Sequence, residues 1–508
     1  MDLVSPFGRK WFSPANNRDS LLFSALGFYF IYLLTKHSGI GLSPDSIIYL
    51  SVARNFKTGH GLIQFDHVPL ADFPVLYPIF LGIISIVVNS DPLTFAPVLN
   101  GFMFAILIYL AGSIMNEFRI FSRWYKLIVL SAIVMSPALL EVYPMLWSET
   151  LFILLLLVFF IAARSYFLHP KKSVLISLAL IAGLASITRY AGVTVIGCGC
   201  VLVFLDPRFQ FKRRIRKLLV FAFVSSLPLL VNLIRNRLLF GYSTGMRQKG
   251  TTPLLDNLYF LGSVFCDWLP LPKERPALSL AIALVCIMLL IYLFYSAWTR
   301  FKSFFSFEEI AITFSLIYIF FILLSATISR YEQLNSRLLS PVFIPVLWSL
   351  SYRIPIFVKK LSGAWIWIAT VMIVALTLGF QYNQLTADYE TYDGVKDAGV
   401  PGYTEDPFPQ SDIVKYIVGN KSSFQKGYMI YSNAADAFYL FTSISADVLP
   451  QVAFPHHLEQ FYAEKKFYLI WFNDIVDPDI PMLKEILDHR KMTPVAQLSD
   501  GSVWISVD

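Results

Sequence analysis

The sequence predicts a polytopic α-helical membrane protein with a small α/β domain at its C-terminal end. Of its 508 residues, 56 % are hydrophobic and only 15 % are charged, whereas soluble domains carry about 25 % charged residues. This composition excludes a soluble globular protein. Eleven apolar runs approach the roughly 20 residues that a helix needs to cross a bilayer, and the composition becomes polar after the last run, near Gln384.

The apolar runs set the expected topology. We place spans at residues 21–36, 94–115, 127–140, 150–163, 174–187, 191–205, 218–234, 278–297, 310–328, 338–352 and 365–382. A twelfth run, Phe73–Asn89, is short and contains Pro74 and Pro78. The other spans alternate consistently in orientation only if this run does not cross. We therefore expect an interfacial or re-entrant helix on the outer side, with a simple span as the alternative.

The loops predict which side each span end faces. Lys and Arg residues in short loops mark the cytoplasmic side of a membrane protein, and they cluster at residues 9–18 and 212–217. The N-terminus is then cytoplasmic, and Asp45 and the chain after Tyr382 are extracytoplasmic. The formal net charge of +7 comes from these loops, so it indicates membrane topology and no nucleic-acid partner.

The chain after the last span predicts a separate domain, with residues 1–383 in the membrane part and 384–508 outside it. Strand-like runs at Gly427–Tyr431 and Phe467–Phe472 alternate with helical patterns at 411–418, 433–440 and 480–487. This alternation predicts an α/β domain with some parallel strand pairing. Aromatic residues of the strands, such as Tyr468 and Trp471, are expected in its core.

Several kinds of site are not indicated. The four cysteines show no disulfide framework or metal-ligand spacing, and we find no glycine-rich phosphate loop, no zinc signature and no sign of a cofactor. A divalent metal stays open as an alternative, although no ligand spacing indicates one. The adjacent His456 and His457 are predicted to lie in a solvated loop.

An acidic residue follows the first span. Ser43 is a favourable N-cap and Pro44 suits the first helical position, so Asp45 would lie in the first turn of a helix with Tyr49 on the same face. The helix dipole stabilises an ionised carboxylate at this position. Stabilisation of the helix start alone could explain an acidic residue at position 45. A functional role for Asp45 depends on which other charged residues share the outer membrane boundary.

Other charged residues share that boundary. They are Asp72, Glu149, Arg189, Arg247, Arg330 and Arg337. Each alone has a structural explanation, as a first-turn acid or a cation that reaches the interface. Together they suit a lipid-anchored phosphate, which needs Arg or Lys to neutralise it. A hydroxyl acceptor that attacks the adjacent carbon needs a carboxylate base, so Asp45 is the candidate base and Arg337 the candidate phosphate ligand.

These motifs resemble the glycosyltransferase C superfamily, in the family 39 branch of protein O-mannosyltransferases and lipid A aminoarabinose transferase. Asp45, Tyr49, Ala53 and the Gly59-His60-Gly61 segment are similar to its first outer loop. The proline-rich run 73–78, Glu149, Thr188-Arg189 and the segment Arg337–Pro341 follow in the same order. The resemblance covers about residues 20–382.

The resemblance implies a sugar transfer from a polyprenyl-phosphate donor to a hydroxyl acceptor, with inversion, at the outer face of the inner (cytoplasmic) membrane. Asp45 would be the general base, Glu149 a second acid and Arg337 a donor ligand. Further substrate contacts would come from Asp72, Tyr49, Arg189, Arg247 and Arg330. The chain departs from the family pattern where Phe73 follows Asp72, because the aminoarabinose transferase has a lysine there.

Two other function classes compete with this interpretation. A transporter or flippase of lipid-linked sugars would place ionisable or helix-breaking residues near the bilayer midplane and show inverted repeats. Charges in this sequence instead collect at the ends of the spans. A membrane anchor for a C-terminal binding module would need a single span and would leave the boundary charges unexplained.

Overall fold

The computed structural model describes residues 17–118, 122–245, 247–269, 271–299, 306–330, 332–424 and 427–506. They form two compact units. The first contains the described residues up to Leu34, Ala71–Tyr77 and Pro97–Gly394; the second contains Thr35–Leu70, Pro78–Ala96 and the described residues from Val395 onwards. The basic residues that the sequence analysis assigns to the cytoplasm before Asn17 lie outside the described residues.

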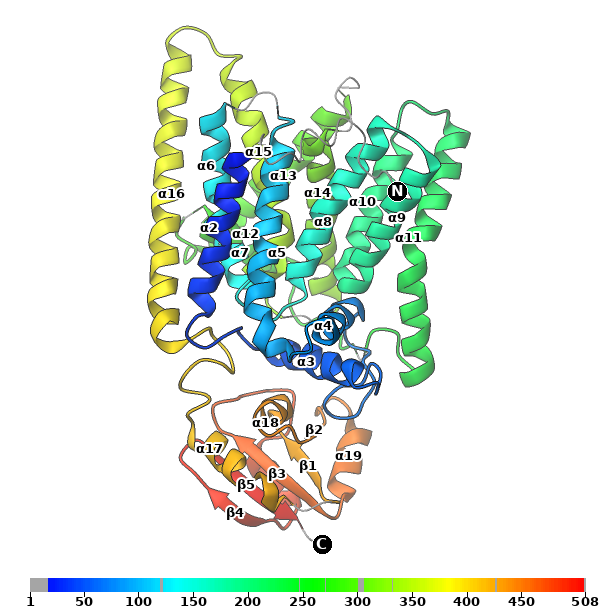
Figure 1. The fold of residues 1–508 in the computed structure, drawn as a ribbon, viewed down its shortest axis with the longest axis vertical. Helices are drawn as coiled ribbons and strands as arrows, with labels where there is room; N and C mark the ends of the chain where they lie inside the picture. Colours follow the sequence, from blue (N-terminus) through cyan, green and yellow to red (C-terminus); the bar gives the residue numbers. More distant parts are fainter. Residues whose placement is uncertain are drawn as a thin grey trace. The chain divides into compact units, whose positions relative to one another are not determined.

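The first unit is a bundle of helices (Figure 1). They are α2 (Arg18–Thr35), α5 (Pro92–Met115), α6 (Arg123–Val134), α7 (Pro137–Val142), α8 (Glu149–Leu168), α9 (Lys172–Thr188), α10 (Val193–Phe204), α11 (Phe211–Phe240), α12 (Leu254–Trp268), α13 (Pro276–Thr299), α14 (Phe307–Ile328), α15 (Ser336–Val358) and α16 (Ala364–Ala398), with the 3₁₀ turn η2 (Tyr190–Gly192). In the described part of the chain, eight helical segments are long and apolar enough to cross a membrane. The predicted polytopic helical fold is confirmed.

The structure refines several predicted boundaries. The expected span 127–140 is two helices, α6 and α7, because Pro137 starts a new helix whose N-cap Ser136 accepts a hydrogen bond from the Leu139 amide. The basic segment 212–217 is the start of α11 and no loop. Helix α16 continues through the predicted boundary at residue 384 to Ala398. The predicted boundary rested on a change from apolar to polar composition, and a helix can continue across such a change. The sequence analysis missed α12.

The twelfth apolar run contains helix α4 (Leu76–Val87). Its 12 residues are about 18 Å long at 1.5 Å per residue, well short of the roughly 30 Å of a hydrocarbon core. This length agrees with an interfacial or re-entrant helix and disfavours the simple span.

Ion pairs of the first unit lie at helix ends. Glu117, just after α5, pairs with Arg164 near the end of α8. Arg353 near the end of α15 pairs with Glu308 at the start of α14, and Lys126 Nζ at the start of α6 lies 3.0 Å from an Asp19 oxygen in α2. Because successive helices alternate in direction, these ends lie on one side of the bundle, and the cytoplasmic location of that side stays a prediction.

The second unit contains one sheet in the described part of the chain, with strand order β2-β1-β3-β5-β4 (Figure 1). Its strands are β1 (Met429–Ser432), β2 (Asp447–Val448), β3 (Phe467–Phe472), β4 (Thr493–Gln497) and β5 (Gly501–Ser506), and its helices are α3 (Pro44–Lys57), α17 (Asp412–Gly419), α18 (Ala435–Thr442), α19 (Pro455–Ala463) and α20 (Leu483–His489), with the 3₁₀ turn η3 (Lys421–Ser423). Strand β1 runs parallel to β2 and β3, whereas β5 pairs antiparallel with β3 and β4. The expected α/β character and parallel pairing are confirmed.

The aromatic residues of β3 pack as expected. Tyr468 is buried, and Trp471 packs against a core cluster that includes Phe461 and Leu469. The loop predicted for His456 and His457 is wrong, because both lie in the first turn of α19, although they are exposed. Pro455 at the first position starts this helix, and the sequence analysis did not use that signal.

Helix α3 belongs to the same compact unit as the sheet. Arg54 of α3 forms two hydrogen bonds with Asp91, of 2.7 and 3.1 Å, and its guanidinium lies 6.0 Å from the ring centre of Tyr439 in α18. The segment before α3 is held as well, because the Tyr403 amide donates to the Leu42 carbonyl at 2.9 Å. The helix that carries Asp45 is therefore built into the C-terminal domain's packing.

The close approach of α12 and α13 depends on Gly262. A Cβ atom at Gly262 would lie 1.7 Å from the Ser279 carbonyl oxygen, whereas a Cβ at Gly379 in α16 meets no atom within 4 Å. Gly262→Ala should destabilise the protein by about 1–3 kcal/mol through overpacking. Gly379→Ala is the matched control and should be neutral or stabilising, since Ala favours helix by about 1 kcal/mol. Thermal unfolding in detergent measures both, and equal midpoints would contradict the packing argument.

Candidate functional site

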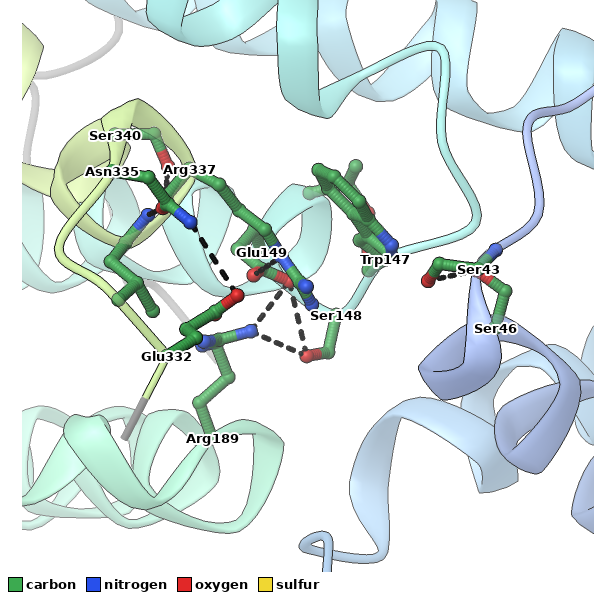
Figure 2. A network of polar contacts seen from close by, with 12 residues as sticks. Ser43, Ser46, Trp147, Ser148, Glu149, Arg189, Glu332, Asn335, Arg337 and Ser340 are labelled. Carbon is green, nitrogen blue, oxygen red and sulfur yellow. Dashed lines mark hydrogen bonds and ion pairs between the residues drawn. The ribbon is translucent and has the colours of Figure 1, made fainter. Parts of the chain in front are cut away.

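A buried carboxylate between two arginines forms the centre of the candidate site (Figure 2). Glu149 Oε2 lies 2.5 Å from Arg189 Nη1, and Glu149 Oε1 accepts a 2.6 Å hydrogen bond from Arg337 Nε. The side chains are 1 %, 14 % and 11 % exposed, respectively. The structure thus brings together three residues that the sequence analysis selected separately, two as substrate ligands and one as an acid.

Three helix ends place these side chains. Glu149 opens α8, where the helix dipole stabilises a carboxylate, and Arg189 follows the last residue of α9, where it stabilises a cation. Arg337 lies in the first turn of α15, whose N-cap Asn335 accepts a 2.9 Å hydrogen bond from the Leu338 amide. A cation there is opposed by the dipole, so its contact with Glu149 must offset that cost.

Two neighbours complete the setting of the arginines. The Arg337 guanidinium carbon lies 3.9 Å from the ring centre of Trp147, a cation–π distance. Arg189 Nη1 also donates to Ser148 Oγ at 3.1 Å. Sequence reasoning assigned no role to Trp147 or Ser148, although both directly precede Glu149. Nothing in the sequence pairs Trp147 with Arg337, because Trp147 lies in the loop before α8 and Arg337 lies on α15.

The cluster is rich in arginine. Two guanidiniums contact one carboxylate, and a second carboxylate, Glu141, acts electrostatically on Arg337, in a setting where ions are poorly solvated. Buried charges are costly unless they are paired. The planar guanidinium groups of arginine match the geometry of phosphate oxygens, so two arginines at one membrane boundary suit an anionic ligand.

Asp72 and Arg247 lie close together in the first unit. A Cβ at Gly245, which has a positive φ of 74°, would lie 1.9 Å from Asp72 Oδ1, so only glycine lets this loop approach the carboxylate. Arg247 in the same loop is near enough to act electrostatically on Asp72. The carbonyl of Ala71 accepts a 2.9 Å hydrogen bond from the Tyr190 hydroxyl, which ties the Asp72 segment to the turn after Arg189.

The loop that carries Arg247 is also joined to the loop after α14. The amide of Arg330 donates to the Gln248 carbonyl at 3.0 Å, and its Nη1 donates to Gln248 Oε1 at 2.9 Å. The guanidinium of Arg330 is exposed. Arg330 is therefore paired with this loop in the structure, and its role as a substrate ligand stays a prediction.

The remaining predicted residues, Asp45 and Tyr49, lie on α3 in the second unit. The expected cap is present: Pro44 starts the helix, and the Ser43 amide donates to Ser46 Oγ at 3.1 Å (Figure 2). Asp45 is half-buried and Tyr49 is 2 % exposed. Tyr49 thus has the environment of a packed core residue, and its substrate contact stays a prediction.

A second carboxylate of the same unit, Asp436, lies within electrostatic reach of Asp45. Asp436 of α18 accepts a 2.7 Å hydrogen bond from the Tyr403 hydroxyl. Burial raises the pKa of the Asp436 carboxyl, the Tyr403 hydrogen bond lowers it, and the Asp45 carboxylate raises it further. Sequence reasoning did not find Asp436, because no local motif links a short helix of the C-terminal domain to α3.

Comparison with solved structures identifies proteins with a similar fold. The chain matches ArnT from Cupriavidus metallidurans in the apo state with a TM-score of 0.59 at 13 % identity, over 97 % of this chain and 99 % of that one. The structure of ArnT bound to undecaprenyl phosphate matches with a TM-score of 0.57 at 13 % identity, over 96 % of this chain and 97 % of that one. The chain also matches the archaeal oligosaccharyltransferase AglB from Archaeoglobus fulgidus, in complex with an inhibitory peptide and a dolichol-phosphate. The TM-score is 0.53 at 11 % identity, over 92 % of this chain and 70 % of that one.

These structural neighbours belong to the glycosyltransferase C superfamily. The chain has the glycosyltransferase C fold. No protein-family model matches its sequence, and no curated protein does so either. At such low identity the likeness establishes the fold, whereas the reaction has to be argued from the chain's own residues.

The ion cluster yields a stability prediction. Glu149→Gln removes the carboxylate that pairs with two buried guanidiniums, and breaking such a buried pair costs about 3–5 kcal/mol. Glu117→Gln is the matched control, because it breaks the single, more exposed pair with Arg164 and should cost less. Arg189→Gln added to Glu149→Gln should recover part of the loss. Thermal unfolding in detergent compares the variants, and equal losses for both Glu→Gln changes would count against the cluster.

Proposed function

We propose that this protein is a membrane glycosyltransferase that moves a sugar from a polyprenyl-phosphate donor to a hydroxyl acceptor at the extracytoplasmic face of the inner (cytoplasmic) membrane. The observation that carries the proposal is the buried Glu149 between Arg189 and Arg337. The guanidinium groups of these two arginines match the oxygens of a donor phosphate. Support also comes from the fold, which is shared with a protein whose structure contains undecaprenyl phosphate.

In the proposed reaction the acceptor oxygen attacks the anomeric carbon of the donor sugar. Asp45 takes the acceptor proton as general base, the new carbon–oxygen bond forms, and the bond from the anomeric carbon to the phosphate oxygen breaks with inversion. The polyprenyl phosphate leaves with an additional negative charge. Arg337 and Arg189 stabilise this charge, because cations fixed before the reaction need no reorganisation.

In this scheme Glu149 touches neither substrate. It is fully buried and contacts both arginines, so we assign it the role of holding their side chains in place. The Asp72–Arg247 pair is the proposed second polar contact of the donor or acceptor. The acceptor itself is a protein, lipid or glycan that presents a hydroxyl group.

The rival function is transport of a lipid-linked sugar. Within the described residues, charged side chains of the spanning helices lie towards the helix ends, as Glu149, Arg164, Arg337 and Arg353 do. Transporters instead use ionisable groups near the midplane. This distribution favours a reaction at the membrane surface over transport through the bilayer.

A direct assay separates the two functions. Purified protein in lipid vesicles is supplied with synthetic polyprenyl-phosphate sugars and membrane extract as acceptor, and free polyprenyl phosphate is measured by mass spectrometry. A transferase releases polyprenyl phosphate in proportion to enzyme. Movement of the intact donor between leaflets without release would support the transporter.

Asp45→Asn should lower sugar transfer by about 10²–10⁴-fold, because the amide cannot accept the proton that a general base removes. Asp66→Asn is the control: it makes the same change in the same unit, and an amide oxygen can also accept the hydrogen bond that the Val68 amide donates to Asp66. Transfer rates of the two folded variants are compared. Wild-type transfer by Asp45→Asn would refute the base assignment.

Arg337→Lys should raise the donor concentration needed for half-maximal rate by about tenfold or more, because one ammonium cannot replace a two-pronged guanidinium contact. Arg353→Lys makes the same substitution at the other end of α15, where the arginine pairs with Glu308, and should leave donor use unchanged. Initial rates against donor concentration measure both. A shift of the same size in both variants would show that the effect is structural.

A further inference from the structure

The C-terminal domain contains a cavity of its own. The segment 402–413, the end of β3 and the turn between β4 and β5 line it, and its volume is about 330 Å³. This volume lies in the range of small-molecule sites, about 300–1,000 Å³. All of its lining residues belong to the second unit. The proposed transfer reaction uses none of them.

Aromatic rings form one part of the cavity wall. Phe408 and Phe472 are stacked with ring centres 6.0 Å apart and planes 10° apart, and the ring centres of Tyr403 and Phe408 lie 5.0 Å apart. Phe472 and Tyr403 are buried, and the Tyr403 hydroxyl is held by Asp436 at 2.7 Å. These contacts fix the rings, while Phe408 stays half-buried. The wall is therefore a preformed apolar surface.

A hydroxyl group without a partner lies in the same wall. Ser411 is the N-cap of α17, yet the side chain that caps this helix is Asp500, which accepts hydrogen bonds from the amides of Asp412 at 2.6 Å and Ile413 at 3.0 Å. Among the described residues, Ser411 Oγ is buried and has no hydrogen-bond partner. Buried polar atoms are almost always satisfied, so this oxygen points to a ligand or water in the cavity.

Carboxylates complete the lining. Glu405, Asp474 and Asp500 border the cavity. The Asp500 carboxylate already accepts hydrogen bonds from the amides at the start of α17. Carboxylates accept hydrogen bonds and cannot donate them when ionised. The cavity thus offers acceptors, one hydroxyl and an aromatic surface, and it offers no cationic side chain for a phosphate.

We propose that this pocket binds a sugar ring of a saccharide. A sugar ring presents C–H groups on its faces, which pack against aromatic rings such as Phe408, and hydroxyl groups at its edge. Those hydroxyls donate to Glu405 and Asp474 and exchange a hydrogen bond with Ser411. The proposal concerns binding alone, so it is independent of the transfer reaction.

An organic cation is the competing ligand, because ammonium groups also bind aromatic faces beside carboxylates. A quaternary ammonium cannot form a hydrogen bond with Ser411, whereas a sugar hydroxyl can. The Ser411 hydroxyl therefore favours the saccharide.

The test is saturation-transfer NMR on the full-length protein in detergent. The probes are methyl glycosides of glucose, mannose and N-acetylglucosamine, with tetramethylammonium chloride as the cationic probe. We expect transfer to the ring protons of at least one glycoside, and a loss of at least tenfold in Phe408→Ala. Phe454→Ala removes a half-buried ring outside the pocket and should keep the signal.

Two gentler variants guard against a folding defect in Phe408→Ala. Ser411→Ala removes a single oxygen and should weaken glycoside binding several-fold. Asp474→Asn should do the same, while Asp488→Asn, an exposed site on α20, should not. Transfer to no glycoside, transfer to tetramethylammonium alone, or equal binding by wild type, Ser411→Ala and Asp474→Asn would each overturn the proposal.

Discussion

The contact of Glu149 with Arg189 and Arg337 is the interaction on which the rest of the site depends. It joins the start of α8, the end of α9 and the start of α15. Trp147 and Ser148 are further partners of the two arginines, and Glu141 acts electrostatically on Arg337. Burying two arginines together is a disadvantage for folding and an advantage for binding a phosphate.

The bilayer explains where this charge lies. Spans with uncharged middles confine ionised groups to helix ends, and alternating helix directions sort those ends into two sets. One set contains the pairs of Arg164 with Glu117 and Arg353 with Glu308. The other contains the Glu149 cluster and the Arg247 and Arg330 loops. The second set contains a carboxylate that two arginines share, and it is the set that the proposed reaction uses.

Local sequence signals predicted much of the fold and some of the site. Hydropathy predicted the polytopic helical fold. It gave eleven spans, whereas eight of the described helical segments are long and apolar enough to cross a membrane. Ser43 with Pro44 predicted the start of the helix that carries Asp45. Local sequence signals could not predict contacts between distant residues. Glu149 and Arg337 are 188 positions apart, and any of several cations at the membrane boundary could have paired with Glu149. Helix α12 was missed because Asp256 and Asp267 make it look like a loop, and the antiparallel strand β5 has a weak apolar pattern. The role of Asp436 also follows only from three-dimensional packing.

The central claim is that the arginines bind a lipid-anchored phosphate, and ligand-dependent stability tests it most directly. A ligand that binds the folded state raises the unfolding midpoint in proportion to its affinity. Purified protein is therefore heated with undecaprenyl phosphate or with undecaprenol, which has the same chain without the phosphate. The account predicts a clear rise in midpoint with the phosphate and little with the alcohol. Equal shifts for both lipids would contradict it.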